Sequence, residues 1–319
     1  MGHLTGTGGF PHMAAGVAAS LAHLGVVCFF CISGFLITTL LVNEERAFGD
    51  VSLRNFYARR ALRILPAFLV FAGCMLLARS MGLVEFQDRD AVYALTWTSN
   101  YQLNRGWIFG HTWSLSIEEQ FYLLWPLAVA TLAALGRLRL VTFMFLVGPL
   151  VRTAMRLAFH NSVRDLEIFP ATADAIAIGA AFALQREALL SNTLYARISS
   201  ARYAMPLAMA AFLIERYSDY TIIDLLLGPV KLLAIATLVE GSTRYVGAGR
   251  AILNWRPIAW IGTLSYSLYL WQQPFLNRSA HLPWNQFPAN LALAVGAACM
   301  SLYLVEKPIL RFSRYFRRR

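Results

Sequence analysis

Long apolar segments separated by short polar loops recur from one end of the chain to the other. About 20 apolar residues suffice to cross the ~30 Å hydrocarbon core of a bilayer as a helix. The segments lack the alternation of apolar and polar residues that is typical of a transmembrane β-barrel. We therefore predict an all-α, polytopic transmembrane helical bundle. The nine predicted spans are residues 17–42, 64–80, 113–135, 140–158, 170–185, 204–215, 220–240, 257–276 and 288–305.

The loops between the spans carry no separate domain. Residues 90–101 are apolar but too short to cross the bilayer, and we expect a re-entrant or interfacial segment there. No internal repeat or appended soluble domain is visible. We expect residues 1–319 to form a single integral-membrane domain, with 306–319 as a basic tail.

Composition supports a membrane location. Of the 319 residues, 58% are hydrophobic and only 14% are charged, against ~25% in an ordinary soluble domain. The water-soluble enzyme classes are therefore excluded. The net charge is +11, but no basic run is interleaved with aromatics in a polar context. We therefore exclude nucleic-acid binding and attribute the charge to loops that face anionic lipid.

The basic residues also predict an orientation. Alternate loops and the tail hold 19 of the 28 Lys and Arg residues, and the opposite loops hold six. The positive-inside rule then places the C-terminus in the cytoplasm and residue 1 outside, in the inner cell membrane. Because an outside start without a signal peptide is unusual, we expect a further helix to precede residue 1, so that the domain is N-terminally truncated.

The strongest candidate for chemistry opens the third span, with the sequence HTWSLSIEEQFY. Helical spacing places His111, Ser114, Glu118 and Tyr122 on one face, and turns Glu119 about 100° away. Ionisable groups inside a membrane usually have a function, so we expect this face to line a cavity. The alternative is a helix N-terminus whose acids complement the helix dipole and whose serine is a cap.

Three arginines precede the second span. Arg59 and Arg63 lie one turn apart beside Arg60, and guanidinium groups suit phosphate oxygens. They could hold a phosphate-rich cytosolic donor such as coenzyme A, or simply anchor the loop at the membrane surface.

Two spans carry further polar residues. Ser33 could act as a nucleophile, but we favour a packing role because Ser33-Gly34 permits close helix approach. Asp174 lies among small residues. Arg152 and Arg156 are candidates to pair with it and with Asp224.

Aromatic residues that include Tyr269 and Trp271 end the eighth span, where they can line the site or form an interfacial belt. Cys28 and Cys31 lie one turn apart inside an apolar helix without a second ligand pair, so we predict packing residues there.

Taken together, these motifs resemble the acyltransferase-3 family of integral-membrane O-acyltransferases. The matching segments are GVVCFFCISGFLIT, FYARRALRILP, HTWSLSIEEQFYLLWP, LSYSLYLWQQP and a late Glu306-Lys307-Pro308, in the order of the family. The resemblance implies a bundle of roughly ten helices. It further implies an acyl-CoA donor, for which acetyl-CoA is the first candidate. The acyl group would be transferred to a hydroxyl of a carbohydrate such as O-antigen, exopolysaccharide, lipopolysaccharide or peptidoglycan.

The resemblance also implies the catalytic residue. The histidine that closes the family's first helix corresponds to His3, which would act as general base on the acceptor hydroxyl or carry the acyl group briefly. Glu118 or Glu119 would orient His3 or the hydroxyl, and Trp113 would line the site. No metal is needed. The alternatives are a polytopic transporter, since buried charges also mark substrate paths, and an inactive truncated family member.

Overall fold

The computed structural model describes residues 4, 7–10, 15–159, 167–277, 283–316 and 318. Over these residues the chain is helical and contains no strand, which confirms the all-α prediction. Each predicted span coincides with a helix. Within the described ranges, five helices are long and apolar enough to cross a membrane: Gly16–Phe48, Leu53–Ser80, Ala134–Ala158, Thr221–Ser242 and Ala289–Phe316.

The other four predicted spans are shorter or more polar helices, and their membrane crossing stays a prediction. They are α5 (Thr112–Thr131), α7 (Phe169–Leu184), α10 (Ala204–Arg216) and α13 (Arg256–Phe275). Residues 90–101 form the end of α3 (Asp88–Leu95) and a short 3-10 turn (Ser99–Tyr101), neither of which is long enough to span a bilayer.

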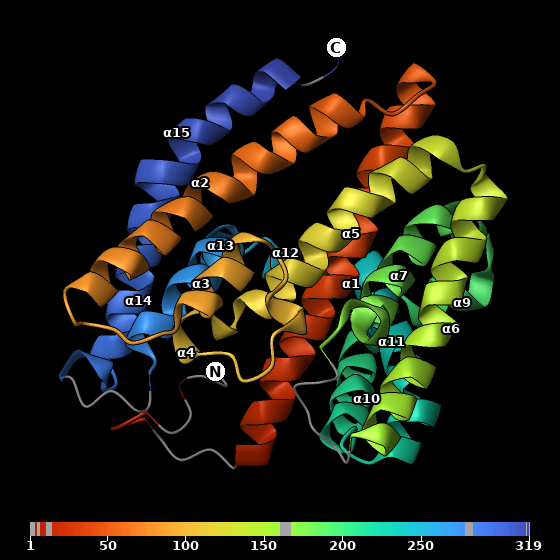
Figure 1. Ribbon diagram of the computed structural model, residues 1–319. Coiled ribbons are helices and arrows are strands. Elements are labelled where there is room, and N and C mark those ends of the chain that lie inside the picture. The colour runs from red at the N-terminus through yellow and green to blue at the C-terminus, as the bar shows by residue number, and fades with distance from the viewer. Residues whose placement is uncertain are drawn as a thin grey trace. The chain divides into compact units, whose positions relative to one another are not determined.

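The chain forms two compact units. The first unit comprises residues 1–14, 52–116 and 256–319, and the second comprises 15–51 and 117–255. Helices wholly within the first unit are α2 (Leu53–Ser80), α3, α4 (Trp107–Gly110), α13, α14 (Ala289–Met300) and α15 (Lys307–Leu310). Helices wholly within the second unit are α1 (Ala15–Phe48), α6 (Ala134–Ala158), α7, α8 (Arg186–Ser191), α9 (Thr193–Ile198), α10, α11 (Thr221–Ser242) and α12 (Gly247–Leu253) (Figure 1). Helix α5 contributes its first turn to the first unit and the remainder to the second.

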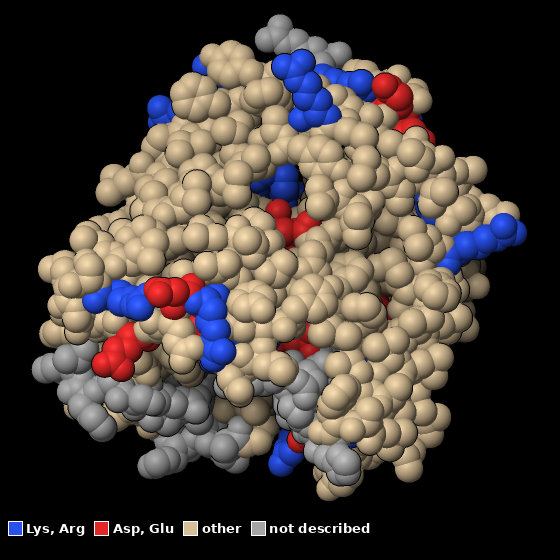
Figure 2. Space-filling view, in the orientation of Figure 1, with Lys and Arg blue, Asp and Glu red and all other residues tan. Residues whose placement is uncertain are grey.

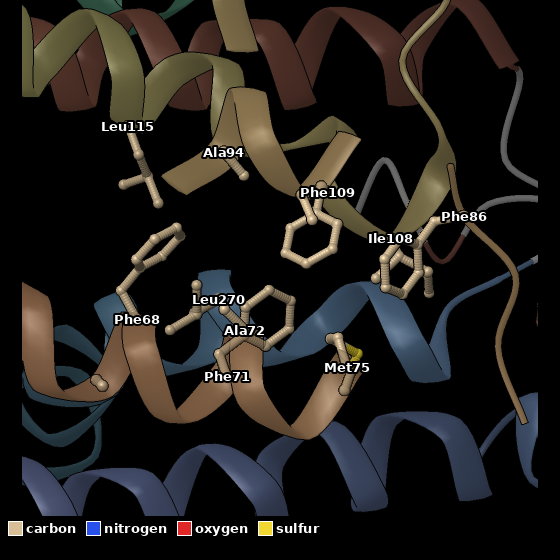
Figure 3. Close-up of a cluster of buried hydrophobic side chains, with 12 residues drawn as sticks. Phe68, Phe71, Ala72, Met75, Phe86, Ala94, Ile108, Phe109, Leu115 and Leu270 are labelled. Atoms are coloured by element: carbon tan, nitrogen blue, oxygen red, sulfur yellow. The ribbon is translucent and has the colours of Figure 1, made fainter. Parts of the chain in front are cut away.

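The core of the first unit forms along one face of α2 (Figure 3). Phe68, Phe71, Ala72 and Met75 follow the i, i+3, i+4, i+7 spacing of a helix face and are all buried. Side chains from α3, α4, α13 and the start of α5 pack on them. This core holds the first turn of α5 beside α13.

The last transmembrane-length segment of the first unit changes its helical pitch. Helix α14 continues into a π-helical stretch, Ser301–Glu306, and then into α15. Both of these segments and the following 3-10 helix (Arg311–Phe316) contact α2, so the predicted basic tail is anchored along that helix (Figure 1).

In the second unit, α1 and α7 cross at two glycines. A Cβ atom at Gly34 would lie 2.0 Å from the backbone oxygen of Ile176, and one at Gly179 would lie 2.0 Å from that of Cys31. Only hydrogen fits at these positions, so the close helix approach predicted at Ser33-Gly34 is confirmed. Cys31 is fully buried, as a packing residue should be.

Uncharged residues dominate the face shown in Figure 2, and charged side chains are sparse on it. Large apolar side chains such as Leu77, Leu157 and Leu226 are 62%, 73% and 65% exposed on their helices. Exposed leucines in this number are expected where the surrounding solvent is lipid.

Candidate active site

The polar face predicted on α5 is present. His111 immediately precedes the helix, and Ser114, Glu118 and Tyr122 follow along it; all four are buried, each at most 3% exposed. Glu119, turned to another side of the helix, is half-buried. Burial of this face supports a role inside the protein rather than at a solvent-exposed helix end.

In the first unit, a tyrosine from α13 connects two residues of this face. The hydroxyl groups of Tyr269 and Ser114 lie 2.6 Å apart, and the Tyr269 hydroxyl also donates to the backbone oxygen of His111 at 2.7 Å. The Tyr269 and His111 rings meet edge to face, with centroids 5.3 Å apart. The structure therefore brings Tyr269 to two predicted site residues that lie 155 and 158 positions before it in the sequence.

Aromatic rings continue this cluster. The ring of Phe71 on α2 lies edge to face with His111 at 5.8 Å and with Trp271 at 5.4 Å. Trp107 donates its indole N–H to the backbone oxygen of Gln273 at 2.7 Å, which fixes the end of α13. Aromatic faces with neighbouring hydroxyl groups suit the apolar face and hydroxyls of a sugar ring. Trp113 is half-buried on α5.

In the second unit, Ser33 and Glu118 form a buried pair. The hydroxyl of Ser33 on α1 donates to Oε1 of Glu118 on α5 at 2.5 Å. Both side chains are nearly inaccessible. No acid or base lies beside Ser33 in the sequence, since its partner is 85 residues away. A carboxylate that accepts this hydrogen bond is held in one orientation and can in turn orient a hydroxyl or an imidazole.

The ion pairs predicted for Arg152 are confirmed. Its guanidinium group contacts Asp174 at 2.9 Å and Asp224 at 2.8 Å, and Arg156 lies 3.3 Å from Asp224. A Cβ atom at Gly148 would lie 2.7 Å from that of Asp174, so a glycine is needed where α6 meets α7. These residues join α6, α7 and α11 within the second unit. Asp174 is therefore an ion-pair partner of Arg152.

The three arginines at the start of α2, Arg59, Arg60 and Arg63, differ in burial and contacts. Arg59 donates to the backbone oxygen of Phe316 at 2.6 Å and is half-buried, so it holds the C-terminal segment in place. Arg60 is half-buried and Arg63 is exposed. Their predicted contact with the donor's phosphates stays a prediction.

His3 lies outside the described residues, so its predicted role is untested by the geometry. Within the described part of the chain, no three His, Cys, Asp or Glu side chains gather as a metal site would require.

Two buried charge clusters of the second unit were missed by the sequence analysis. The first joins His23, Glu215 and Lys231. In the second, Glu240 is fully buried and accepts hydrogen bonds from Arg244 at 2.8 Å and from the Tyr195 hydroxyl at 2.9 Å. The first cluster joins residues of three helices, which no local spacing connects. In the second, Glu240 and Arg244 have the i, i+4 spacing of a helical ion pair, whereas Tyr195 comes from α9.

Electrostatics in the second cluster follow from burial and the shared carboxylate. Burial, followed by the hydrogen bond to Glu240, raises the pKa of Tyr195 well above its ordinary value. The hydrogen bond to the same carboxylate raises the pKa of Arg244. Tyr195 therefore stays neutral and Arg244 stays charged. Their hydrogen bonds to Glu240 hold α9 and the loop after α11 against the same carboxylate.

Comparison with known proteins gives a consistent picture. The model of a family described as an acyltransferase domain matches residues 1–306. YrhL of Bacillus subtilis, whose name assigns it provisionally to peptidoglycan O-acetylation, is 29% identical over 325 residues, which cover 90% of this chain and 50% of YrhL. The O-acetyltransferase OatA of Staphylococcus aureus is 28% identical over 321 residues, covering 90% of this chain and 52% of OatA.

The chain therefore spans about half the length of these curated relatives. No solved structure shows a significant match. The relatives' names contain peptidoglycan and O-acetylation, so the lipopolysaccharide acceptor that we expected from the motifs finds no support in them.

Proposed function

Because the chain belongs to the acyltransferase family whose model covers residues 1–306, we propose that it is a membrane O-acyltransferase with acyl-CoA as donor. An acetyl or other acyl group would pass to a hydroxyl of a cell-surface or exported carbohydrate. The names of YrhL and OatA favour acetyl as the group, and the name of YrhL favours a sugar of peptidoglycan as the acceptor. O-antigen and exopolysaccharide remain acceptors to be tested beside it.

The observation that carries this proposal is the buried polar face at the start of α5. An apolar helix that buries a histidine, a serine, a glutamate and a tyrosine along one side bears a large desolvation cost, which function explains better than packing does. Hydroxyl and carboxylate groups of this kind can align an acceptor hydroxyl beside an activated carbonyl.

In the proposed reaction, His3 takes the proton of the acceptor hydroxyl while the hydroxyl oxygen bonds to the acyl carbon. The carbon–sulfur bond then breaks, and coenzyme A leaves as the thiolate. In the second possible role, His3 receives the acyl group first and passes it to the hydroxyl. Glu118, fixed by Ser33, would orient the reacting groups, with Glu119 as the alternative. Arg60 and the exposed Arg63 would hold the donor's phosphates, with Arg59 supporting them from its bond to the C-terminal segment.

The proposed topology has nine spans within this chain and a cytoplasmic C-terminus. It places the arginines of α2 on the side where coenzyme A is found, in support of the donor assignment. The predicted loops at that side hold 19 of the 28 basic residues.

A transporter is the second candidate, favoured by the cluster of Arg152, Arg156, Asp174 and Asp224 inside the second unit. Transport would move a solute without consuming a thioester, so the two candidates give opposite results in one assay.

The test is acyl transfer by purified protein in liposomes, with labelled acetyl-CoA and soluble peptidoglycan fragments. We expect labelled ester on the glycan together with free coenzyme A. Uptake of the glycan without loss of thioester would support the transporter instead. His3→Ala protein that still transfers acetyl at the unaltered rate would contradict the role of His3.

A further inference from the structure

A histidine held by a carboxylate lies in the second unit, apart from the residues used above. Nδ1 of His23 on α1 lies 2.7 Å from Oε1 of Glu215 on α10. The other carboxylate oxygen, Oε2, accepts a hydrogen bond of 2.8 Å from Nζ of Lys231 on α11. Three neighbouring helices therefore contribute one residue each (Figure 1).

Burial is strongly unequal within this triad. The side chains of Glu215 and Lys231 are 4% and 5% exposed, whereas that of His23 is 54% exposed. Glu215 and Lys231 already neutralise each other, so an exposed histidine is not needed to compensate a buried charge. A histidine that serves only packing would be expected to bury its ring.

The geometry fixes which ring nitrogen is reactive. Nδ1 faces a carboxylate oxygen, so it carries a proton whether or not the ring is charged. Nε2 is the nitrogen left to gain or lose a proton. A carboxylate that fixes the tautomer of a histidine and stabilises the imidazolium is the arrangement that general bases use. Lys231 holds that carboxylate in place from behind.

Other ionisable groups lie around the triad. Cys28, five residues after His23 on α1, interacts electrostatically with Glu215 and Lys231. On α7, the only ionisable residue is Asp174, which Arg152 binds. Arg216 on α10 lies against Gly16, two turns before His23 on α1. On α5, Glu118 contacts Ser33. Ser33 lies almost three turns beyond His23 on α1.

We propose that His23 is a second general base of this protein, with Glu215 and Lys231 as its positioning residues, and that its ligand is a hydroxyl of a carbohydrate. Nε2 takes the proton as the O–H bond breaks. The oxygen forms the ester bond to the acyl carbon, and the thiolate of coenzyme A leaves. This inference rests on the proposed function.

The first test compares His23→Ala with a matched control, Ser20→Ala, one turn earlier on α1. The Ser20 hydroxyl donates to the backbone oxygen of Gly16 on its own helix, so its loss should leave acetyl transfer unchanged. A general base contributes about 100-fold or more to a rate, so we expect His23→Ala to lower kcat by about 100-fold. Added imidazole should restore at least about tenfold, because it replaces the lost base.

The second test uses the pH dependence of kcat. A general base must be unprotonated to act, so kcat should fall at low pH, and this fall should be absent in His23→Ala. The double variant Glu215→Gln with Lys231→Met removes both charges together. It should slow transfer by about tenfold. Transfer should continue without added imidazole, because His23 is still present as the base but is no longer held in position.

These outcomes separate the two proposals. If unaltered protein transfers no acyl group, the proposed function fails. If it does transfer, the assignment of His23 is overturned by His23→Ala protein with the rate of the Ser20→Ala control. It is overturned equally by a loss that is uniform across pH and that imidazole does not restore, since that result indicates a structural role.

Discussion

Replacing Gly34 by alanine should separate α1 from α7. The added Cβ would lie 2.0 Å from the backbone oxygen of Ile176 and 3.1 Å from the backbone nitrogen of Ala180. An ordinary contact begins near 3.4 Å, so the gap to the oxygen must open by about 1.4 Å. Both obstructing atoms are helical backbone and cannot rotate away. The helices themselves must move.

Such a shift should affect both stability and activity. Overpacking costs ~1–3 kcal/mol where side chains can adjust, and we expect the upper end, about 3 kcal/mol, because here they cannot. For a chain of this size that corresponds to a fall in Tm of about 6 °C or more. Ser33 precedes Gly34 directly, so its 2.5 Å hydrogen bond to Glu118 should lengthen or break, and acetyl transfer should fall.

The assay is thermal unfolding in detergent together with the transfer rate of the same preparation. Gly25→Ala on the same helix is the matched control, because a Cβ there meets nothing within 4 Å. Alanine at that position should be neutral or slightly stabilising. A Gly34→Ala protein that melts within about 1 °C of the Gly25→Ala control would refute the close crossing of α1 and α7.

Three further predictions concern polar clusters. Arg152→Met leaves two buried carboxylates without their shared cation, so the protein should lose about 3–5 kcal/mol, measured by thermal unfolding; an unchanged Tm would contradict the ion pairs. Tyr269→Phe removes a hydroxyl that bonds a serine and a backbone oxygen, and should lower kcat about tenfold, or ~1.4 kcal/mol, with little change in Tm. Because the pKa of Tyr195 is raised in the folded state above its ordinary value of 10.0, stability should be constant below that pH and fall as pH rises above it. Tyr195→Phe should flatten this fall in chemical unfolding followed at several pH values, and an identical pH dependence would contradict the raised pKa.

Much of the fold could be predicted from local pattern. Helices are visible because each apolar window is continuous in the sequence, and the face of α5 follows from spacings of three and four residues between His111, Ser114, Glu118 and Tyr122. The close packing at Gly34 could be predicted because small residues in an apolar helix have few other uses.

The partners of these residues were harder to predict. Arg152 could be matched to Asp174 and Asp224 because buried charges must pair, and few charges lie within the spans. By contrast, Ser33 and Glu118 are 85 residues apart, and His23 and Glu215 are 192 apart. Such pairs depend on which helices become neighbours, and that information is not contained in any local spacing.

The alignment of the α2 arginines with a donor site was a weaker prediction for a similar reason. The three arginines are close in the sequence: Arg59, Arg60 and Arg63. Arg59, however, donates a hydrogen bond to the backbone oxygen of Phe316, near the other end of the chain. A basic cluster in a loop can bind a ligand or anchor a segment, and only the tertiary contacts distinguish the two.

The most direct measurement of the central claim is acetyl transfer from labelled acetyl-CoA to peptidoglycan fragments by purified protein in liposomes, with ester-linked label and released coenzyme A followed in the same sample. We expect equal amounts of both products, with a strong loss in Ser33→Ala and Glu118→Gln and none in Gly25→Ala. Protein that is folded by thermal unfolding yet transfers no acetyl group to any glycan, or that transfers it equally well without the hydroxyl and carboxylate of this pair, would contradict it.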